Sequence, residues 1–561
     1  MEYKKENLEL AECIFPEITE TIEDLEKKYP ERNLPEGAHV TRFAPSPTGF
    51  LHTGALFTSL VCKRLAEQSN GIFYVRIEDT DRKREVEGSV QRLIVELKKF
   101  NIMPEEGMVG DNTESGIYGP YKQSDRELIY KICAKELIKR GLAYPCFCST
   151  EDIDKIREGQ EKTKIKPGYY GRYARCRNIE PSEAMQRIKS GDPYILRLRS
   201  NGTSLGKISY KDIIRGKIEI AENDQDIVII KSDNLPTYHF AHVVDDHFMR
   251  TTTVVRGEEW IASVPIHLEL FKLLGFKAPK YGHLPGIMKM DGGSKRKLSK
   301  RKDPEAAVSY FLEQGYEVDA VLEYLLGIIN SDFEPWRRQN KDKNMKEFTM
   351  RTEKISVSGA LFDLVKLNDV SKEYISRMNS KQVYESVCKW ASEFNKTYAE
   401  KLANNKEYAL KVFAVERDMA AKVRKDITKW SEVEEAFSYF YEDEFAKVVE
   451  SGYNYTELIE KMGADKIKEV LNAYKAKHDV KIEKNDWFNG LKEIAADLGF
   501  CTDMKAYKKD PDSYIGNISH VAEIVRIAIT DRKNTPDIYE IMKVLGDETV
   551  IARLNKALNT L

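Results

Sequence analysis

The sequence lacks the long apolar run and the leader segment that membrane and secreted proteins usually carry. None of its apolar runs approaches the roughly 20 residues that a helix needs to cross a bilayer. The opening segment, MEYKKENLELAECIFPEITE, is acidic and amphipathic, whereas a secretory leader is basic and then apolar. We therefore expect a cytoplasmic protein with no membrane partner.

Cysteine is scarce and neither sign of charge dominates. The 8 cysteines are spread over the whole length, which predicts no disulfide framework and agrees with a reducing compartment. The 89 basic and 91 acidic residues give a net charge of −2, so a nucleic acid would have to be held by local basic patches. A chain of 561 residues that is 41% hydrophobic can bury several cores, and we expect about three or four domains.

Phosphate-binding features appear first in the segment RFAPSPTGFLHTGALFTSL (Arg42–Leu60). His52 and Gly54 stand where an extended stretch, Val40–Ala44, gives way to a helix whose free first-turn amides attract an anion. The next segment, IFYVRIEDT (Ile72–Thr80), is rich in β-branched and aromatic residues, which indicates a strand. The order strand, glycine turn, helix, strand is typical of half of a nucleotide-binding βαβ unit.

A second basic segment, KRKLSKRKDPEAA (Lys295–Ala307), lies far along the chain. It gathers Lys297, Lys300 and Arg301 on a loop that two glycines introduce. On its own, a histidine near a helix start is usually structural, and a lysine run is usually a solvated surface. Together, the two segments predict two elements that converge on one triphosphate.

The two segments resemble the signatures of class I aminoacyl-tRNA synthetases. PSPTGFLHTGA is similar to the HIGH signature, with HTGA beginning at His52, and KLSKR is similar to the KMSKS signature. The blocks RFAPSPTG, RIEDTD, YHFAHVVDDH and VVRGEEW resemble bacterial-type glutamyl-tRNA synthetases. The resemblance runs from about residue 40 to about residue 340 and continues more weakly through GALFDLVKLNDVSKEYI.

The resemblance implies a ligase of protein synthesis. Such an enzyme activates L-glutamate with ATP to glutamyl-adenylate and transfers the acyl group to the 3′ end of tRNA(Glu). The partners are then tRNA(Glu), L-glutamate and ATP, with Mg²⁺ bound through the nucleotide phosphates. The resemblance also implies a monomer.

The segment pattern and the resemblance together predict an α/β Rossmann-like catalytic domain with an inserted acceptor-binding subdomain, followed by an all-α anticodon-binding region. Short alternating segments between glycine turns indicate the insertion. In the last third, apolar residues such as Val383 and Val387 recur at helical spacing. We expect five parts: an acidic N-terminal extension at 1–37, the first catalytic half at 38–144, the insertion at 145–230, the second catalytic half with the KLSKR loop at 231–343, and the helical region at 344–561.

The resemblance assigns residues to the reaction with ATP. Both steps develop negative charge on oxygen, so positioning and cationic donors should matter more than a nucleophilic side chain. The implied catalytic residues are His52, Lys297 and Lys300. The implied ATP-binding residues are Thr48, His52, Gly54, Glu259 and Lys300.

Glutamate recognition requires a second set of residues. A planar guanidinium pairs with a carboxylate in a two-pronged way that the amide of glutamine cannot reproduce. The substrate ammonium needs a carboxylate, for which Glu78 is the matching position. By the resemblance, glutamate is bound by Arg42, Ala44, Ser46, Glu78, Tyr238, His242 and Arg256.

Three cysteines resemble the zinc knuckle of some glutamyl enzymes. Cys146 and Cys148 form C-x-C, and Cys176 follows. The position where some family members carry a fourth nitrogen ligand is Asn178 here, and either Tyr170 or Tyr173 could take its place. Structural zinc prefers four Cys or His donors, so we favour reduced thiols over a zinc site.

Several alternatives share part of this pattern. Glutaminyl-tRNA synthetase has the same fold and both signatures, but it usually ends in β-barrels, which the helical last third disfavours. A truncated tRNA-modifying relative lacks the anticodon-reading portion. A silent tRNA-binding paralogue need not keep His52, Gly54, Lys297 and Lys300, and a generic nucleotidyltransferase need not carry RIEDTD. A non-discriminating enzyme that also charges tRNA(Gln) stays an open alternative.

Overall fold

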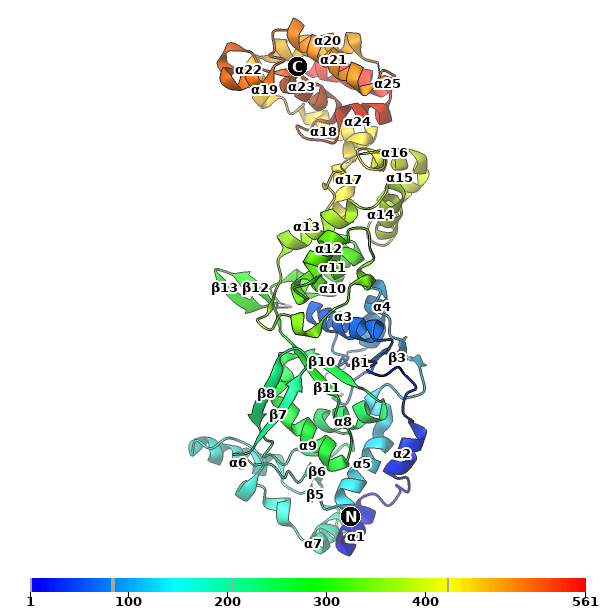
Figure 1. Ribbon diagram of the computed structural model, residues 1–561, viewed down its shortest axis with the longest axis vertical. Helices are drawn as coiled ribbons and strands as arrows, with labels where there is room; N and C mark the ends of the chain where they lie inside the picture. Colours follow the sequence, from blue (N-terminus) through cyan, green and yellow to red (C-terminus); the bar gives the residue numbers. More distant parts are fainter. Residues whose placement is uncertain (1–2, 82–85, 204, 300, 421–422, 480) are drawn as a thin grey trace. The chain divides into compact units, whose positions relative to one another are not determined.

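The computed structural model describes residues 3–81, 86–203, 205–299, 301–420, 423–479 and 481–561. The chain forms two compact units (Figure 1). The first consists of Met1–Tyr310 and Leu322–Asp363, and the second of Phe311–Val321 and Leu364–Leu561. Among the described residues, no helix is both long and apolar enough to span a membrane.

The first half of the nucleotide-binding fold is a sheet with the strand order β1-β2-β3-β4. β1 pairs with β2 and β2 with β3 in parallel, and β4 is antiparallel to β3. Helix α3 begins after His52, as predicted, and its buried apolar stripe includes Leu56, Leu60 and Leu65. The elements are β1 (Val40–Phe43), α3 (Thr53–Gln68), β2 (Ile72–Val75), α4 (Ser89–Lys99), β3 (Glu106–Met108) and β4 (Glu114–Ser115).

The second half of the fold lies beside the first. The backbone N–H of Thr252, just before β10 (Thr253–Gly257), donates to the carbonyl of Val40 in β1 at 3.0 Å. β10 pairs in parallel with β11 (Lys280–Leu284), within a sheet of order β10-β11-β7-β8. The helices α8 (Tyr238–Phe248) and α9 (Val264–Leu274) pack against each other.

The predicted insertion contains an antiparallel sheet and a hairpin. The sheet orders β5-β6-β9, and the hairpin pairs β7 with β8. The hairpin joins the catalytic sheet, because Asp212 of β7 pairs with Tyr281 of β11. The limits 145 and 230 stay a prediction. Helix α5 (Glu127–Lys139) precedes the predicted insertion, and β5 (Ala143–Cys146) crosses its predicted start. The elements within it are α6 (Thr150–Lys162), α7 (Pro181–Lys189), β6 (Ile195–Leu198), β7 (Lys207–Asp212), β8 (Gly216–Ala221) and β9 (Val228–Ile230).

A short hairpin carries the lysine-rich segment. β12 (Ile287–Asp291) and β13 (Ser294–Lys297) are antiparallel, and β14 (Ala360–Leu361) pairs with β12. Gly292 and Gly293 form the two-residue turn with φ of 54° and 87°, a conformation that favours glycine. The turn therefore fixes the register that ends β13 at Lys297.

The N-terminal extension packs on the catalytic domain. Helix α1 (Lys5–Ile14) contacts α5 and α7, and α2 (Ile22–Lys28) contacts α5. Lys135 of α5, which is buried, donates to the carbonyls of Phe15 and Ile18 at 3.0 and 2.7 Å. These bonds tie the extension to the domain that it precedes.

The regular elements in the described part of the second unit are all helices. Val383, Val387 and Ala391 are buried on one face of α14, and Trp390 is partly buried, so the predicted helical spacing is confirmed. Helices α10 (Val308–Gln314) and α11 (Val318–Ile329) span two of the three points where the chain passes between units, and α12 (Phe333–Gln339) belongs to the first unit. The others are α13 (Leu364–Ile375), α14 (Ser380–Phe394), α15 (Lys396–Asn404), α16 (Lys406–Ala414), α17 (Val433–Ala436), α18 (Glu442–Val448), α19 (Thr456–Met462), α20 (Ala464–Lys477), α21 (Lys484–Asp497), α22 (Met504–Lys509), α23 (Ile518–Thr530), α24 (Ile538–Leu545) and α25 (Asp547–Thr560).

Candidate active site

Two adjoining cavities in the first unit receive most of the predicted site residues. The first, of about 430 Å³, is lined by His52, Gly54, Glu259 and Lys297, and the second, of about 800 Å³, by Ser46, Glu78 and Tyr238. Both are lined by Arg42, Ala44 and Arg256, so these three residues stand where the cavities meet. The residues predicted for ATP and those predicted for glutamate thus divide between two connected spaces.

Two predicted residues, Thr48 and His242, do not line these cavities. Thr48 is exposed on the loop before α3, and its backbone N–H donates to the carbonyl of Ser46 at 2.8 Å. His242 is fully buried beneath Arg42, and it contacts the hydroxyl of Tyr281 at 3.2 Å. Lys300 lies outside the described residues.

His52 caps the helix that follows it. Its Nδ1 accepts a hydrogen bond from the backbone N–H of Gly54 at 2.9 Å, so in the neutral ring the proton is on Nε2. The Thr53 hydroxyl donates to the carbonyl of Glu305 at 2.6 Å, and the backbone N–H of Val308 donates to the carbonyl of Leu51. These bonds join the start of α3 to the chain that follows the lysine-rich loop, although the two segments are far apart in sequence.

An ion pair closes the lysine-rich loop. The guanidinium of Arg296 donates two hydrogen bonds to the carboxylate of Asp303 at 2.6 and 2.8 Å, and the Ser299 backbone N–H donates to the same group at 2.9 Å. The hydrogen bond from Arg296 holds the pKa of Asp303 well below its usual range. The loop between these residues is therefore anchored at both ends, with Lys297 facing the first cavity.

A buried charge network supports the second cavity. Asp246 of α8 accepts hydrogen bonds from Arg42 at 3.3 Å and from Arg76 at 2.7 Å, and Arg76 also donates to Glu78 at 3.1 Å. Burial opposes ionisation of Asp246, but the two guanidinium groups outweigh it and hold its pKa below the ordinary value. Arg42 therefore already has an anionic partner within the protein.

Arg76 and Asp246 were missed in the sequence, although both lie in blocks that carry the resemblance. Arg76 is the first residue of RIEDTD and is fully buried, as is Asp246 of YHFAHVVDDH. A buried charge must be paired, so an arginine at the end of an apolar strand was the available signal.

Burial raises the pKa of Glu78, and the neighbouring Arg76 and Arg42 oppose that rise.

Arg256 differs from Arg42 in having no carboxylate within ion-pair distance among the described residues. It is 6% exposed. Its Nε donates to Nε2 of His283 at 3.1 Å, and its Nη atoms donate to the Tyr238 hydroxyl and the Trp260 carbonyl, each at 3.2 Å. Nδ1 of His267 lies 3.4 Å from both Nη atoms. A buried cation among neutral acceptors is costly unless an anion joins it, so this geometry favours a carboxylate ligand.

The histidines around Arg256 are neutral at physiological pH. Burial, reinforced by the charge of Arg256, lowers the pKa of His239 to about 4. Burial likewise holds the pKa values of His242 and His267 well below the ordinary value. These rings therefore act as hydrogen-bonding groups and add no positive charge to the pocket.

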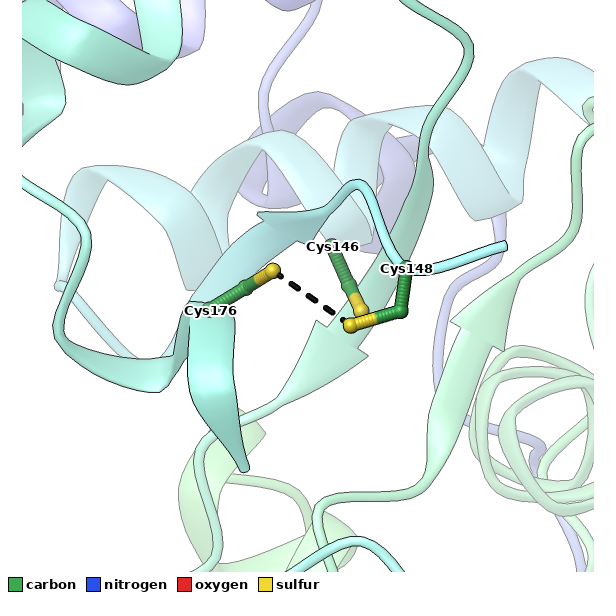
Figure 2. A group of neighbouring side chains, drawn as sticks. All are labelled: Cys146, Cys148 and Cys176. Carbon is green, nitrogen blue, oxygen red and sulfur yellow. Dashed lines mark hydrogen bonds between the residues drawn. The ribbon is translucent and has the colours of Figure 1, made fainter. Parts of the chain in front are cut away.

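The three predicted cysteines form a cluster at the end of β5 (Figure 2). The sulfur atoms of Cys146, Cys148 and Cys176 lie within 4.8 Å of one another, and those of Cys148 and Cys176 are 3.7 Å apart. The hydroxyl of Tyr169 lies 3.4 Å from the Cys146 sulfur and 3.3 Å from the Cys148 sulfur.

The tyrosine beside these thiols is not one of the two considered from the sequence. Asn178 is exposed, the Tyr170 hydroxyl donates to the Lys166 carbonyl at 2.6 Å, and the Tyr173 hydroxyl accepts from Arg172. Burial raises the pKa of Tyr169, which keeps its phenol protonated and a poor metal ligand. The donor set thus fits three of the four positions of a tetrahedral zinc site.

Comparisons with known proteins place the chain in a family. Residues 39–369 match the family model described as tRNA synthetases class I (E and Q), catalytic domain, and residues 516–558 match the model described as anticodon binding domain. The chain belongs to the class I tRNA synthetases of the E and Q type. The predicted fold class is confirmed.

Within this family, the chain is similar over its full length to glutamate–tRNA ligases. It is 49% identical over 549 residues to that of Clostridium perfringens (strain SM101 / Type A), covering 98% of this chain and 99% of the relative. It is 44% identical over 559 residues to that of Acetivibrio thermocellus, covering 100% of each. The solved glutamate tRNA ligase of Elizabethkingia meningosepticum, in complex with its amino acid, has a TM-score of 0.71 at 27% identity, over 93% of this chain and 99% of that chain. The predicted resemblance is thus confirmed.

Proposed function

We propose that this chain is a glutamate–tRNA ligase, which joins L-glutamate to tRNA(Glu) at the expense of ATP. One observation carries the proposal. The cavity lined by His52 and Lys297 meets a second cavity at Arg256, a buried cation with only neutral partners among the described residues. A triphosphate and a small dicarboxylic amino acid would therefore lie with their reacting groups together.

In the first step, an oxygen of the glutamate α-carboxylate attacks the α-phosphorus of ATP. A new P–O bond forms, the bond to the pyrophosphate oxygen breaks, and negative charge grows on the phosphate oxygens. The Nε2–H of His52 and the first-turn amides of α3 would donate to these oxygens, and Lys297 would add a positive charge. We assign Lys300 the same role by its position in KLSKR, although it lies outside the described residues.

In the second step, a hydroxyl of the terminal tRNA ribose attacks the carbonyl carbon of the adenylate, and AMP leaves. Neither step needs a covalent intermediate on a side chain, so alignment of the reactants supplies much of the rate. Mg²⁺ would enter with the nucleotide phosphates, since this ion keeps several of its waters.

Amino acid selection would depend on charge pairing. The guanidinium of Arg256 lines both cavities and has only neutral partners among the described residues, so it suits a carboxylate. An amide in place of that carboxylate leaves the buried cation without an anion. Glu78, held at 3.1 Å by Arg76, would accept the substrate ammonium. Arg42 would contribute to the same pocket while paired with Asp246.

Aminoacylation with separated tRNA(Glu) and tRNA(Gln), offered glutamate or glutamine, tests the proposed function. We expect glutamate to be attached to tRNA(Glu), and charging with glutamine would overturn the assignment. Attachment of glutamate to tRNA(Gln) as well would identify a non-discriminating enzyme.

We further propose a cytoplasmic monomer whose cluster of Cys146, Cys148 and Cys176 holds reduced thiols. The assignment of reduced thiols is supported by the group beside the sulfur atoms, which is the Tyr169 phenol, a poor metal ligand, and not a fourth Cys or His. Size-exclusion chromatography with light scattering measures the oligomeric state. Elemental analysis of the purified protein decides the metal content, and one zinc per chain would show that the site binds the ion with a weaker fourth ligand.

A further inference from the structure

One buried histidine lies between a carboxylate of the hairpin and the guanidinium of Arg256. Nδ1 of His283 is 2.6 Å from Oδ2 of Asp212, and Nε2 of the same ring accepts the Nε–H of Arg256 at 3.1 Å. Asp212 and His283 are 1% and 0% exposed, and neither lines the two cavities. The three side chains therefore form a chain of hydrogen bonds that reaches the substrate pocket only at its arginine end.

The hydrogen bonds around Asp212 determine the tautomer of His283. Oδ1 of Asp212 accepts the backbone N–H groups of Ile214 and Arg215, each at 2.9 Å. Burial opposes ionisation of this carboxyl, but the bonds from His283 and these N–H groups hold the pKa of Asp212 below its ordinary value. An ionised carboxylate only accepts hydrogen bonds, so the imidazole proton is on Nδ1, and Nε2 offers its lone pair to Arg256.

This bond determines the plane of the Arg256 fork. Because the His283 ring is fixed, its bond to Nε allows the guanidinium only one orientation. In that orientation the Nη atoms of Arg256 donate to the Tyr238 hydroxyl and the Trp260 carbonyl. The His283 ring is itself held, because it stacks on Tyr281 with centroids 6.1 Å apart and planes 11° apart.

The carboxylate end of the chain of hydrogen bonds belongs to the predicted insertion. Asp212 is the last residue of β7, at the turn of the β7–β8 hairpin, and it pairs with Tyr281 of the catalytic sheet. In the same turn, Nε of Arg215 donates to the His283 carbonyl at 3.0 Å, and its Nη2 contacts Glu258 at 2.5 Å. The hairpin thus holds the ends of both catalytic strands, β10 and β11, that line the first cavity.

We propose that Asp212 and His283 are positioning residues for amino acid selection, which hold the Arg256 guanidinium in the orientation that receives the glutamate carboxylate. The inference rests on the proposed function and adds to it a specificity determinant outside the pocket. It also makes the hairpin of the insertion a structural part of the amino acid site.

The substitution Asp212→Asn tests the proposal. The backbone N–H groups of Ile214 and Arg215, which donate to Oδ1 of Asp212 at 2.9 Å, would bind the side-chain oxygen of asparagine. Its NH₂ group would then face Nδ1 of His283. The His283 ring must then carry its proton on Nε2, so that two N–H groups, this one and the Nε–H of Arg256, face each other. In other proteins, asparagine in place of an aspartate that orients a histidine also stabilises the wrong tautomer of the ring. We expect the glutamate KM to rise by at least about tenfold, with the ATP KM changed by less than about twofold.

A double-mutant cycle separates positioning from a general structural role. Lysine has no Nε–H, so Arg256→Lys already removes the bond to His283, and adding Asp212→Asn should raise the glutamate KM by less than about twofold more. If the increase in glutamate KM of the double variant equals the product of the increases in the two single variants, the proposal is overturned. A wild-type glutamate KM in Asp212→Asn would also overturn it. Asp192→Asn, in an exposed ion pair of the same insertion, is the matched control and should behave as wild type.

A second variant keeps the test open if Asp212→Asn does not fold. His283→Phe retains a ring against Tyr281 and removes both hydrogen bonds, and it should show the same selective rise in glutamate KM. A proportional loss for ATP and glutamate would contradict the positioning role. Failure of the proposed function is distinguishable, because the wild-type chain would then not charge tRNA(Glu) with glutamate in the same assay.

Discussion

The imidazole of His52 and the backbone of Gly54 hold each other in place: Nδ1 of the ring accepts the Gly54 N–H at 2.9 Å. A Cβ at position 54 would lie 3.2 Å from that Nδ1, which is tight contact. Because Gly54 has no side chain, the His52 ring can lie close to its backbone. This position determines the direction of the Nε2–H of His52.

We predict that Gly54→Ala lowers ATP-dependent activation by about tenfold, because a ring displaced by a few tenths of an ångström misaligns its donor to the phosphate. Pyrophosphate exchange in the presence of tRNA measures this effect. The control is Gly159→Ala in α6, where nothing lies within 4 Å of the added Cβ, and alanine should stabilise that helix by about 0.5–1 kcal/mol. Equal exchange rates in Gly54→Ala and Gly159→Ala would refute the predicted role of the contact.

The two pocket arginines should respond differently to substitution by alanine. Both changes should raise the glutamate KM. In other proteins, removal of one partner of a buried charge pair lowers the free energy of unfolding by roughly 3 to 5 kcal/mol. Arg42→Ala also takes a partner from Asp246, so we expect it to lower Tm, whereas Arg256→Ala removes a buried cation with neutral neighbours and should not. Steady-state kinetics with thermal melts checks both parts, and an unchanged glutamate KM in both variants would count against these assignments.

The lysines of KLSKR should act on the transition state. We expect Lys300→Ala, and to a lesser degree Lys297→Ala, to lower adenylate formation by about 10²–10³ while ATP binding is partly retained, as for other donors aimed at developing charge. The measurement is pyrophosphate exchange with tRNA present, together with ATP binding. Lys277→Ala, an exposed lysine after α9, serves as control. A wild-type exchange rate in Lys300→Ala would remove this residue from the mechanism.

The buried histidines should make the protein sensitive to acid. Burial lowers the pKa of His239 from 6.5 to about 4, so below pH 6.5 the unfolded chain binds a proton that the folded chain does not. The stability that depends on this group is complete above pH 6.5 and falls as the pH drops toward about 4. We expect the decrease in Tm between pH 7.5 and pH 5 to be smaller in His239→Phe than in the wild type. An identical decrease would show that His239 titrates normally in the folded protein.

The sequence alone determined the fold class, because the helix and strand signals are local and the family resemblance implies how the resulting domains are arranged along the chain. The glycine turn before α3 and the apolar stripe of α14 each lie within one segment, and the structure confirms the helices that they predict. The grouping of His52, Gly54, Lys297, Arg42 and Arg256 around adjoining cavities followed from the resemblance, with their roles still predictions.

Only the tertiary structure decided which charges are paired. Arg42 and Asp246 are 204 positions apart, Asp212 and His283 are 71 apart, and no local pattern connects them. From the sequence, Arg42 and Arg256 were predicted to have the same role. His242 was predicted to line the pocket, but the structure buries it beneath Arg42. Burial and pairing depend on every element packed around a side chain. Whether an arginine has a carboxylate partner within the protein, as Arg42 has, or only neutral partners among the described residues, as Arg256 has, is therefore decided only when distant strands and helices pack together.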